Sequence, residues 1–423
     1  MKILVLAAYS YFKGHKGFEK NNSGFAYAVS DTCRALTSCG NQVFLLTQSG
    51  ITNGFYFDGV CIIKKKWLDI LFSFYPKDII NGIIAIKGSN ATLIDKLKTI
   101  YYYLNRGYVE RVIRNIKPDV IQIQSVSNYT LPYMLAASKL KVPYIVSNHG
   151  LATFLKDTDM KLKQVEKDFF KYANQEGTIV TTVSTGIKTR LKKTFNINGN
   201  NIYVIPNGFI PNNNDKNIIT LRNTLGINSK DFVFICVGSI SARKNQMQVC
   251  KAFKKLLKDY DDVSLLFAGD GPQFKQLQNY VEANRLYDKV KLLGNVEHDK
   301  MSNYYNISNA TVLASIDEGF GLPVIEGYSY GLPSILYGDL DAAADLSFDE
   351  ATIVVNDRGV VNLANGMRQA IQKKWDKNLI INCSRNFSNH EMGIRYQAVL
   401  KKGIKTNSKM SIDYIMRIIK GRK

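Results

Sequence analysis

Residues 315–333 read Ser-Ile-Asp-Glu-Gly-Phe-Gly-Leu-Pro-Val-Ile-Glu-Gly-Tyr-Ser-Tyr-Gly-Leu-Pro, and this segment carries the strongest structural signal in the chain. The apolar run just before it predicts a buried strand. Gly319 and Gly321 then form a loop, and Pro323 suits the start of a helix over 324–330. A strand, a glycine loop and a helix N-terminus form an anion-binding layout, because free N–H groups and the positive end of the helix dipole converge there.

Two carboxylates flank this loop: Glu318 precedes the glycines and Glu326 lies in the helix, with seven residues between them. An ionised carboxylate repels phosphate but accepts hydrogen bonds, and sugar hydroxyls donate them. We therefore expect a phosphate in the middle of this site and a hydroxyl-bearing ring on either side, which describes a nucleotide-sugar. The alternative is an ordinary strand–turn–helix with two surface glutamates.

The pattern Glu318-Gly-Phe-Gly-Leu-Pro-Val-Ile-Glu326, followed by Gly331-Leu-Pro333, closely resembles the E-x7-E signature of the family-4 retaining glycosyltransferases. That family has the GT-B fold, so the resemblance implies an α/β chain with two Rossmann-like domains facing each other across a central cleft. Glu318 would then hold the sugar hydroxyls and Glu326 the ribose hydroxyls. The loop residues expected to bind the donor are Gly319, Phe320, Gly321 and Leu322.

The chain divides in two, because 423 residues are too many for one core. Residues 1–205 are predicted to form the acceptor-side Rossmann-like domain, and 230–386 the domain that binds the nucleotide-sugar. The polar, turn-forming segment 206–229 is the predicted linker. A helix over 387–403 would cross back to the first domain, and 404–423 would form a basic amphipathic tail.

The net charge of +21 implies a polyanionic partner, which could be nucleic acid, an anionic membrane surface or a phosphorylated substrate. Nucleic acid is not expected, because the sequence has no DNA- or RNA-binding signature and no zinc spacing. Six scattered cysteines without a C-x-x-C pair predict reduced thiols in a cytosolic protein. The sequence has no run of about 20 apolar residues, so a transmembrane helix is not expected.

The first domain opens with a βαβ unit of Rossmann type. Strands are predicted over 2–8 and 42–47, and Ser23 with Gly24 opens the helix between them. The loop lacks G-x-G-x-x-G, so it does not indicate a dinucleotide site. In the resembled family this loop carries glycines that approach the donor phosphates, and Gly24 is the one that matches here. The alternative is a plain tight turn.

One histidine follows a predicted strand of the first domain. The strand over 143–147 leads into Asn148, His149 and Gly150. Open α/β sheets bind ligands at the carboxyl ends of their strands, which is where His149 would lie. His149-Gly150 also resembles the family's strand-end histidine, which lies against the donor sugar and phosphate. A structural role for a single histidine is the alternative.

The second domain places two cations after a strongly apolar strand over 231–237. The loop from Gly238 carries Arg243, a planar fork for phosphate oxygens, and Lys244, a point charge. Cations are unfavourable at a helix N-terminus, so an anion should offset them. The resemblance makes this pair the binding group for the donor diphosphate; a solvated helix start is the alternative.

Two further segments bear on the donor and on metal chemistry. Gly294-Asn-Val296 resembles the segment whose backbone cradles the nucleobase. Asp339-x-Asp341 has the spacing of a metal-binding DxD motif but lies outside the donor loop. Because metal-free members of the family use basic residues instead, the resemblance implies no metal and no other cofactor.

Two segments have the composition of a membrane surface. Residues 64–75 place three lysines beside an aromatic cluster, and Tyr101 to Tyr103 and Arg106 follow. This pattern suits a membrane interface, or else a core helix with a solvated lysine rim. The tail places apolar residues at helical spacing among basic ones, so it would lie on an anionic bilayer or dock on the protein. Those tail residues are Ile412, Ile415, Met416 and Ile419.

The function expected from the resemblance is transfer of a sugar from a nucleotide diphosphate donor, UDP being favoured over GDP, with retention at the anomeric carbon. The proposed catalytic residues are Glu318, His149, Lys244 and Arg243. The basic surplus favours a membrane-associated glycan or glycolipid acceptor at the inner face of a bacterial membrane. The alternatives are a sugar-nucleotide epimerase of GT-B fold, a soluble carbohydrate synthase and a non-enzymatic polyanion-binding protein.

Overall fold

The computed structural model describes residues 1–15, 17–19, 23–47, 54–65, 67–154, 159–210 and 218–421. The chain splits into two compact units. The first comprises Met1–Val183, Ile187–Gly208 and Asn389–Lys423, and the second comprises Ser184–Gly186 and Phe209–Ser388. The boundary after Gly208 falls inside the predicted linker, part of which, 211–217, lies outside the described residues.

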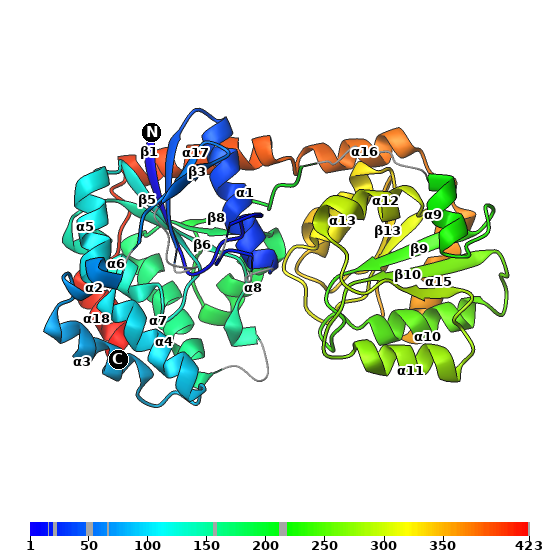
Figure 1. Cartoon of the computed structure of the whole chain (residues 1–423), viewed down its shortest axis with the longest axis horizontal. Helices are drawn as coiled ribbons and strands as arrows, with labels where there is room; N and C mark the ends of the chain where they lie inside the picture. Colours follow the sequence, from blue (N-terminus) through cyan, green and yellow to red (C-terminus); the bar gives the residue numbers. More distant parts are fainter. Residues whose placement is uncertain are drawn as a thin grey trace. The chain divides into compact units, whose positions relative to one another are not determined.

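The first unit is built on an eight-stranded sheet (Figure 1). Its strands are β1 (Lys2–Ala7), β2 (Gln42–Thr47), β3 (Phe55–Phe57), β4 (Val60–Ile62), β5 (Val120–Gln124), β6 (Tyr144–Asn148), β7 (Val180–Thr182) and β8 (Ile202–Val204). They lie in the order β3-β4-β2-β1-β5-β6-β7-β8, and the β3–β4 pair is antiparallel whereas the other neighbours are parallel. The strands predicted over 2–8, 42–47 and 143–147 are thereby confirmed as β1, β2 and β6.

Helices connect these parallel strands, as parallel pairing requires. Those of the first unit are α1 (Gly24–Ser38), α2 (Trp67–Leu71), α3 (Pro76–Ile86), α4 (Leu93–Leu104), α5 (Arg106–Ile116), α6 (Leu131–Lys139), α7 (Met160–Glu176), α8 (Thr185–Phe195), α17 (Asn389–Lys405) and α18 (Ile412–Lys420). A short 3₁₀ turn, η1 (Ala152–Phe154), follows β6. The side chain of Ser23 caps α1 by accepting a hydrogen bond from Ala26 N at 3.3 Å, as its N-cap residue type predicts.

The second unit is built on a six-stranded parallel sheet, and this confirms the α/β class. Its strands are β9 (Phe232–Val237), β10 (Val263–Ala268), β11 (Val290–Leu292), β12 (Ala310–Leu313), β13 (Ser334–Tyr337) and β14 (Thr352–Val355). They lie in the order β11-β10-β9-β12-β13-β14. The chain therefore runs outward from β9 in one direction and from β12 in the other, which makes the gap between these two strand ends the topological switch point, where such sheets bind ligands.

The helices of the second unit are α9 (Ile218–Thr224), α10 (Gln246–Leu256), α11 (Phe274–Ala283), α12 (Met301–Asn306), α13 (Leu322–Ser329), α14 (Ala343–Leu346), α15 (Val360–Gln372) and α16 (Lys377–Arg385), with a 3₁₀ turn, η2 (His298–Lys300). The predicted strand before residue 315 is confirmed as β12. The helix after it begins at Leu322, earlier than the predicted 324, because Gly321 in the left-handed region caps it. Pro323 therefore occupies the second helical position.

The C-terminal segment corrects one expectation about membranes. Helix α17 packs on α1, where a Cβ on Gly393 would lie 2.4 Å from Ala35 O. Helix α18 docks on α3, α6 and α7 and buries its apolar face, Ile415, Ile418 and Ile419. Of the two alternatives for the tail, docking on the protein is confirmed and the bilayer contact is wrong for Ile415 and Ile419, because the first unit covers them; Ile412 is 43% exposed.

Two basic residues of the predicted tail, Arg422 and Lys423, lie outside the described residues. Among the residues that the structure describes, no helix is both long enough and apolar enough to cross a membrane.

Candidate active site

The loops after β9 and β12 meet at the switch point of the second sheet. The N–H of Ile316 donates to Arg243 O at 2.7 Å, and Arg243 Nη1 donates back to Asp317 O at 2.9 Å. These two contacts join the loop that carries the predicted cations to the loop that carries Glu318. The structure thus brings together residues that lie more than 70 positions apart in the sequence.

The centre of this site is an ion pair between Lys244 Nζ and Glu318 Oε2. The two side chains are only 13% and 12% exposed, so water screens their attraction less than at an open surface. Ser315 Oγ donates to the same carboxylate oxygen at 3.2 Å, and Arg243 Nη1 lies 3.9 Å from it. Glu318 therefore supplies part of the negative charge that was predicted beside these two cations.

A glutamine that sequence analysis missed hydrogen-bonds to the backbone of the basic loop, the loop after β9 that carries Arg243 and Lys244. Gln246 is 1% exposed, and its Nε2 donates to Gly238 O at 3.3 Å and to Ser239 O at 3.0 Å. Its Oε1 accepts from Ser241 N at 3.2 Å. A glutamine at a helix start has no distinctive sequence signal, because only the folded loop reveals which backbone groups it contacts.

A second turn closes tightly against this loop. Gly269 has φ +150°, and a Cβ built on it would lie 2.1 Å from Gly238 O. Only glycine permits that approach, so the two strand-end turns fix one another.

The N-terminus of α13 forms the other wall of the site. Gly321 has φ +82°, which glycine adopts without strain, and it caps the helix whose first residue is Leu322. Helix geometry leaves the first N–H groups without an intrahelical partner, and they suit an anionic ligand. The ring of Phe320 is buried and lies 5.9 Å from Phe387, so its backbone is the part suited to contact a donor.

Glu326 is held by a buried tyrosine. Tyr305, 1% exposed, donates from its hydroxyl to Glu326 Oε2 at 2.6 Å and stacks on Tyr330 at 5.4 Å. Val296 packs against the apolar cluster that contains Tyr305, so the predicted base-cradling and ribose-binding segments share one support. Tyr305 had no sequence signal, because its partner lies in another helix.

His149 occupies the carboxyl end of β6 in the first unit. Its Nε2 lies 2.6 Å from Gln124 Oε1, and an amide oxygen only accepts, so the imidazole donates from Nε2. Its Nδ1 is buried and has no partner among the described residues. Phe25, which follows Gly24 in the first turn of α1, packs edge-on at 5.2 Å. The structure thus gathers the predicted first-domain residues at one edge of this sheet.

Burial lowers the pKa of His149 to about 4, below its ordinary value of 6.5. The native state therefore binds fewer protons than the unfolded state between these values, and the free energy of unfolding falls as pH drops through that window. We expect a loss of about 2–3 kcal/mol between pH 7 and pH 4 from this residue. Chemical unfolding at several pH values should show a smaller loss in His149→Gln; an unchanged pH dependence would contradict the assignment.

An arginine holds the aspartate that resembled a metal ligand. Arg358 Nε and Nη2 donate to both carboxylate oxygens of Asp339 at 2.7 and 2.9 Å. Its Nη1 donates to Ser315 O at 2.9 Å, next to the donor loop. Asp339 therefore anchors the arginine that braces this loop. Among the described residues, no cluster of three or more His, Cys, Asp or Glu side chains could hold a metal ion.

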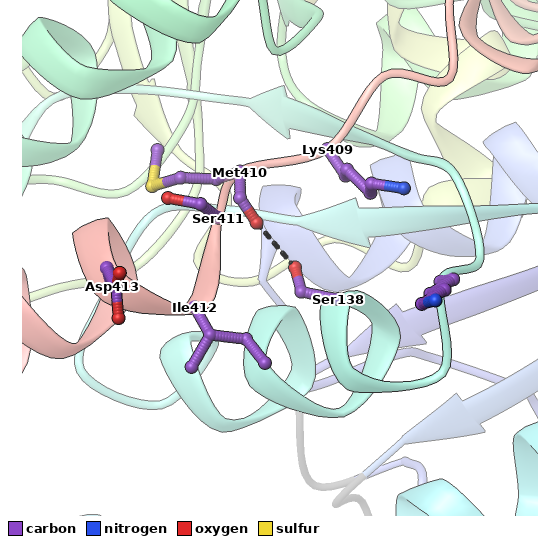
Figure 2. Close-up of a pocket in the computed structure, with 7 residues that line it drawn as sticks. Ser138, Lys409, Met410, Ser411, Ile412 and Asp413 are labelled. Atoms are coloured by element: carbon purple, nitrogen blue, oxygen red, sulfur yellow. Dashed lines mark hydrogen bonds between the residues drawn. The ribbon is translucent and has the colours of Figure 1, made fainter.

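A pocket of about 290 Å³ lies elsewhere in the first unit (Figure 2). It forms where the segment before α18 crosses α6, and Ser138 Oγ donates to Met410 O at 2.7 Å in its wall. None of the predicted site residues lines it. We attribute this pocket to the docking of the C-terminal segment.

Comparison with known families covers both units. Residues 217–386 match the sequence profile of the family described as glycosyl transferases group 1, and residues 23–212 match that of glycosyltransferase family 4. The second profile therefore spans Gly24 and His149, and the first spans Lys244, Glu318 and Glu326.

Two relatives carry the same name, alpha-monoglucosyldiacylglycerol synthase. The Streptococcus pneumoniae protein is 31% identical over 129 residues, a match that covers 30% of this chain and 29% of that protein. The Acholeplasma laidlawii protein is 25% identical over 337 residues, covering 75% of this chain and 77% of that protein. The chain therefore matches well under two thirds of the first of these relatives and most of the second.

Two solved structures share the fold of the whole chain. A glycosyltransferase from Rickettsia africae superposes with a TM-score of 0.70 at 16% identity, covering 96% of this chain and 99% of that one. The Anabaena protein Alr3699/HepE, in complex with UDP, gives a TM-score of 0.67 at 16% identity, covering 95% and 100%. These similarities confirm the GT-B fold.

Proposed function

Because the chain belongs to the group 1, family 4 glycosyltransferases of GT-B fold, we propose that it moves a sugar from a nucleotide diphosphate to an acceptor hydroxyl, with retention at the anomeric carbon. The observation that carries this proposal is the meeting of Lys244, Arg243 and Glu318 at the switch point of the second sheet. Cations for a diphosphate and a carboxylate for sugar hydroxyls lie there in direct contact.

Cleavage of the donor's glycosidic bond places negative charge on the departing diphosphate. Lys244, Arg243 and the N–H groups at the start of α13 would stabilise that charge without a metal ion. Binding of the diphosphate would draw Lys244 away from Glu318, which frees the carboxylate to accept hydrogen bonds from the sugar. No side chain is proposed as a general base; the departing phosphate would take the acceptor proton.

The donor is proposed to be a UDP-sugar. The Anabaena protein, which shares the fold, has been solved in complex with UDP and in complex with UDP-glucose. These complexes support a UDP-sugar over a GDP-sugar. The ribose hydroxyls would bind Glu326, which Tyr305 holds in place. The uracil would lie against the backbone near Val296.

The acceptor is proposed to be a glycan or glycolipid at the inner face of a bacterial membrane, with the enzyme bound peripherally. Two relatives are named as synthases of monoglucosyldiacylglycerol, which supports a lipid-linked acceptor. The net charge of +21 supports an anionic membrane surface.

A donor screen tests this function. We expect the purified chain to bind UDP-sugars in preference to GDP-, ADP- and CMP-sugars, and to hydrolyse one of them slowly, with no effect of EDTA. Release of a changed free sugar would instead indicate an epimerase. Failure to bind any nucleotide-sugar would contradict the proposal and leave polyanion binding as the main property.

A further inference from the structure

Apolar side chains that face solvent concentrate on three consecutive helices, α2, α3 and α4. Of the 21 exposed large apolar side chains in the described part of the chain, ten lie between Leu68 and Leu97. The most exposed are Phe72 at 79% and Leu93 at 72%. Single exposed apolar residues are ordinary, but such a cluster marks an interaction surface. We call residues 67–97 the apolar platform.

The spacing of these side chains shows that each helix turns one apolar face outward. The exposed residues are Leu68, Leu71 and Phe72 in and just after α2, Ile79, Ile80 and Ile83 in α3, and Leu93, Ile94 and Leu97 in α4. In each set the first and last residues lie four positions apart and the middle residue lies three positions from one of them, so the three side chains share one side of the helix. The inner sides pack together, since Gly82 of α3 sits against Ile100 of α4. This is the reverse of the usual apolar-inward arrangement.

The charges of the platform are biased toward positive. Its three carboxylates are each paired with a cation: Asp69 with Arg111 at 3.9 Å, Asp78 with Arg106 at 2.8 Å and Asp95 with Lys98 at 3.3 Å. Exposed Lys77 and Lys87 remain within the platform and exposed Lys64 lies just before it, and none of these three forms an ion pair with a described residue. An apolar face rimmed by surplus lysines complements a surface with an apolar interior and anionic headgroups.

We infer that the apolar platform docks on an anionic lipid bilayer, with its exposed aliphatic and aromatic side chains entering the interface and its lysines contacting the headgroups. A second copy of the chain fits less well, because a twofold contact would press this lysine-rimmed face against an identical face of the same charge. The inference deepens the proposed function by assigning the membrane contact to α2–α4. The C-terminal helix α18 instead packs beneath α3 and has its apolar face covered.

Vesicle flotation with matched variants tests this inference. The platform variant is Phe72→Ser/Ile80→Ser/Leu93→Ser, and the control is Tyr287→Ser/Val361→Ser/Leu379→Ser, three exposed apolar positions of the second unit. Both variants replace solvent-facing side chains, so neither should unfold the chain. We expect the wild type and the control to float with vesicles of equal parts phosphatidylglycerol and phosphatidylcholine. The platform variant should bind these vesicles at least about tenfold more weakly.

Three further results decide the outcome. Binding to pure phosphatidylcholine vesicles should be weaker than to the mixed vesicles, and salt should weaken the mixed-vesicle binding. Equal flotation of the two variants, or no flotation of the wild type, would overturn the inference. So would a wild-type dimer in size-exclusion chromatography that the platform variant abolishes. Binding of a UDP-sugar, measured separately, should be the same in all three proteins, so a failure of the donor proposal remains distinguishable.

Discussion

Replacing Lys244 by alanine is expected to slow sugar transfer by about a hundredfold to a thousandfold, the usual effect of removing one preorganised group that stabilises developing charge. Lys244 Nζ contacts Glu318 in a site where both side chains are about nine-tenths covered, so the ammonium acts with little screening by water. The loss should fall mainly on kcat, because the charge on the diphosphate grows as the glycosidic bond breaks.

Steady-state kinetics together with the donor dissociation constant measure this effect. Lys251→Ala is the matched control, since Lys251 lies on the same helix, α10, and is exposed to solvent. Its activity should stay within about twofold of the wild type, as is usual for a surface substitution. If Lys244→Ala and Lys251→Ala had equal activity, the proposed role of Lys244 in the reaction would be wrong.

The contact between Lys244 and Glu318 has a further consequence for this prediction. Glu318→Ala should also reduce transfer strongly, because it removes the acceptor for the sugar hydroxyls and leaves the ammonium unbalanced. Residues that act as a unit have effects that do not add. The double variant should therefore lose much less activity than the product of the two single losses. A multiplicative loss would show that the two side chains act independently.

The strands and the donor loop could be predicted from the sequence because their signals are local. A buried parallel strand such as β9 is a continuous apolar run in the sequence. A glycine just before a helix likewise indicates a tight turn, independent of distant residues. For the same reason the position of Glu318 after β12 followed from order along the chain alone.

The supporting contacts could not be predicted, because they join distant segments. Gln246 and Tyr305 look ordinary in the sequence, and only the fold sets them against the basic loop and against Glu326. The surfaces show the same limit. The apolar spacing of α18 and of α3 indicates that each helix has an apolar face, but not whether protein covers it. In the folded chain the apolar face of α18 is buried, whereas the apolar face of α3 is exposed to solvent.

Replacing Arg106 by methionine is expected to destabilise the first unit by about 3–5 kcal/mol, because it leaves the buried carboxylate of Asp78 without its cation and removes one of the cations of Glu110. Arg106 is 4% exposed; its Nε donates to Asp78 Oδ1 at 2.8 Å and its Nη1 to Glu110 Oε1 at 2.6 Å. Asp78 is 0% and Glu110 1% exposed. Lys139 Nζ also lies 2.7 Å from Glu110 Oε2, whereas Arg106 is the one ion-pair partner of Asp78 among the described residues.

The pH dependence of this loss identifies its cause. Burial raises the pKa of Asp78, and the Arg106 hydrogen bond opposes that rise, so the variant should raise it further. A raised carboxyl pKa means that the native state binds more protons than the unfolded state, so stability falls as pH increases through that window. Arg106→Met should therefore be less destabilised near pH 5 than near pH 8. Chemical unfolding at both values measures the difference.

Two further variants separate the ion pair from general packing. Arg111→Met removes an arginine that is 44% exposed and 3.9 Å from Asp69, and it should cost about 1 kcal/mol or less. Combining Arg106→Met with Asp78→Leu and Glu110→Met removes the buried carboxylates as well as the cation, and stability should largely return, as it does when apolar residues replace a buried ion network. If the combined variant were as unstable as Arg106→Met alone, lost packing rather than unpaired charge would be the cause, and the ion network would not be what holds α3 to α5.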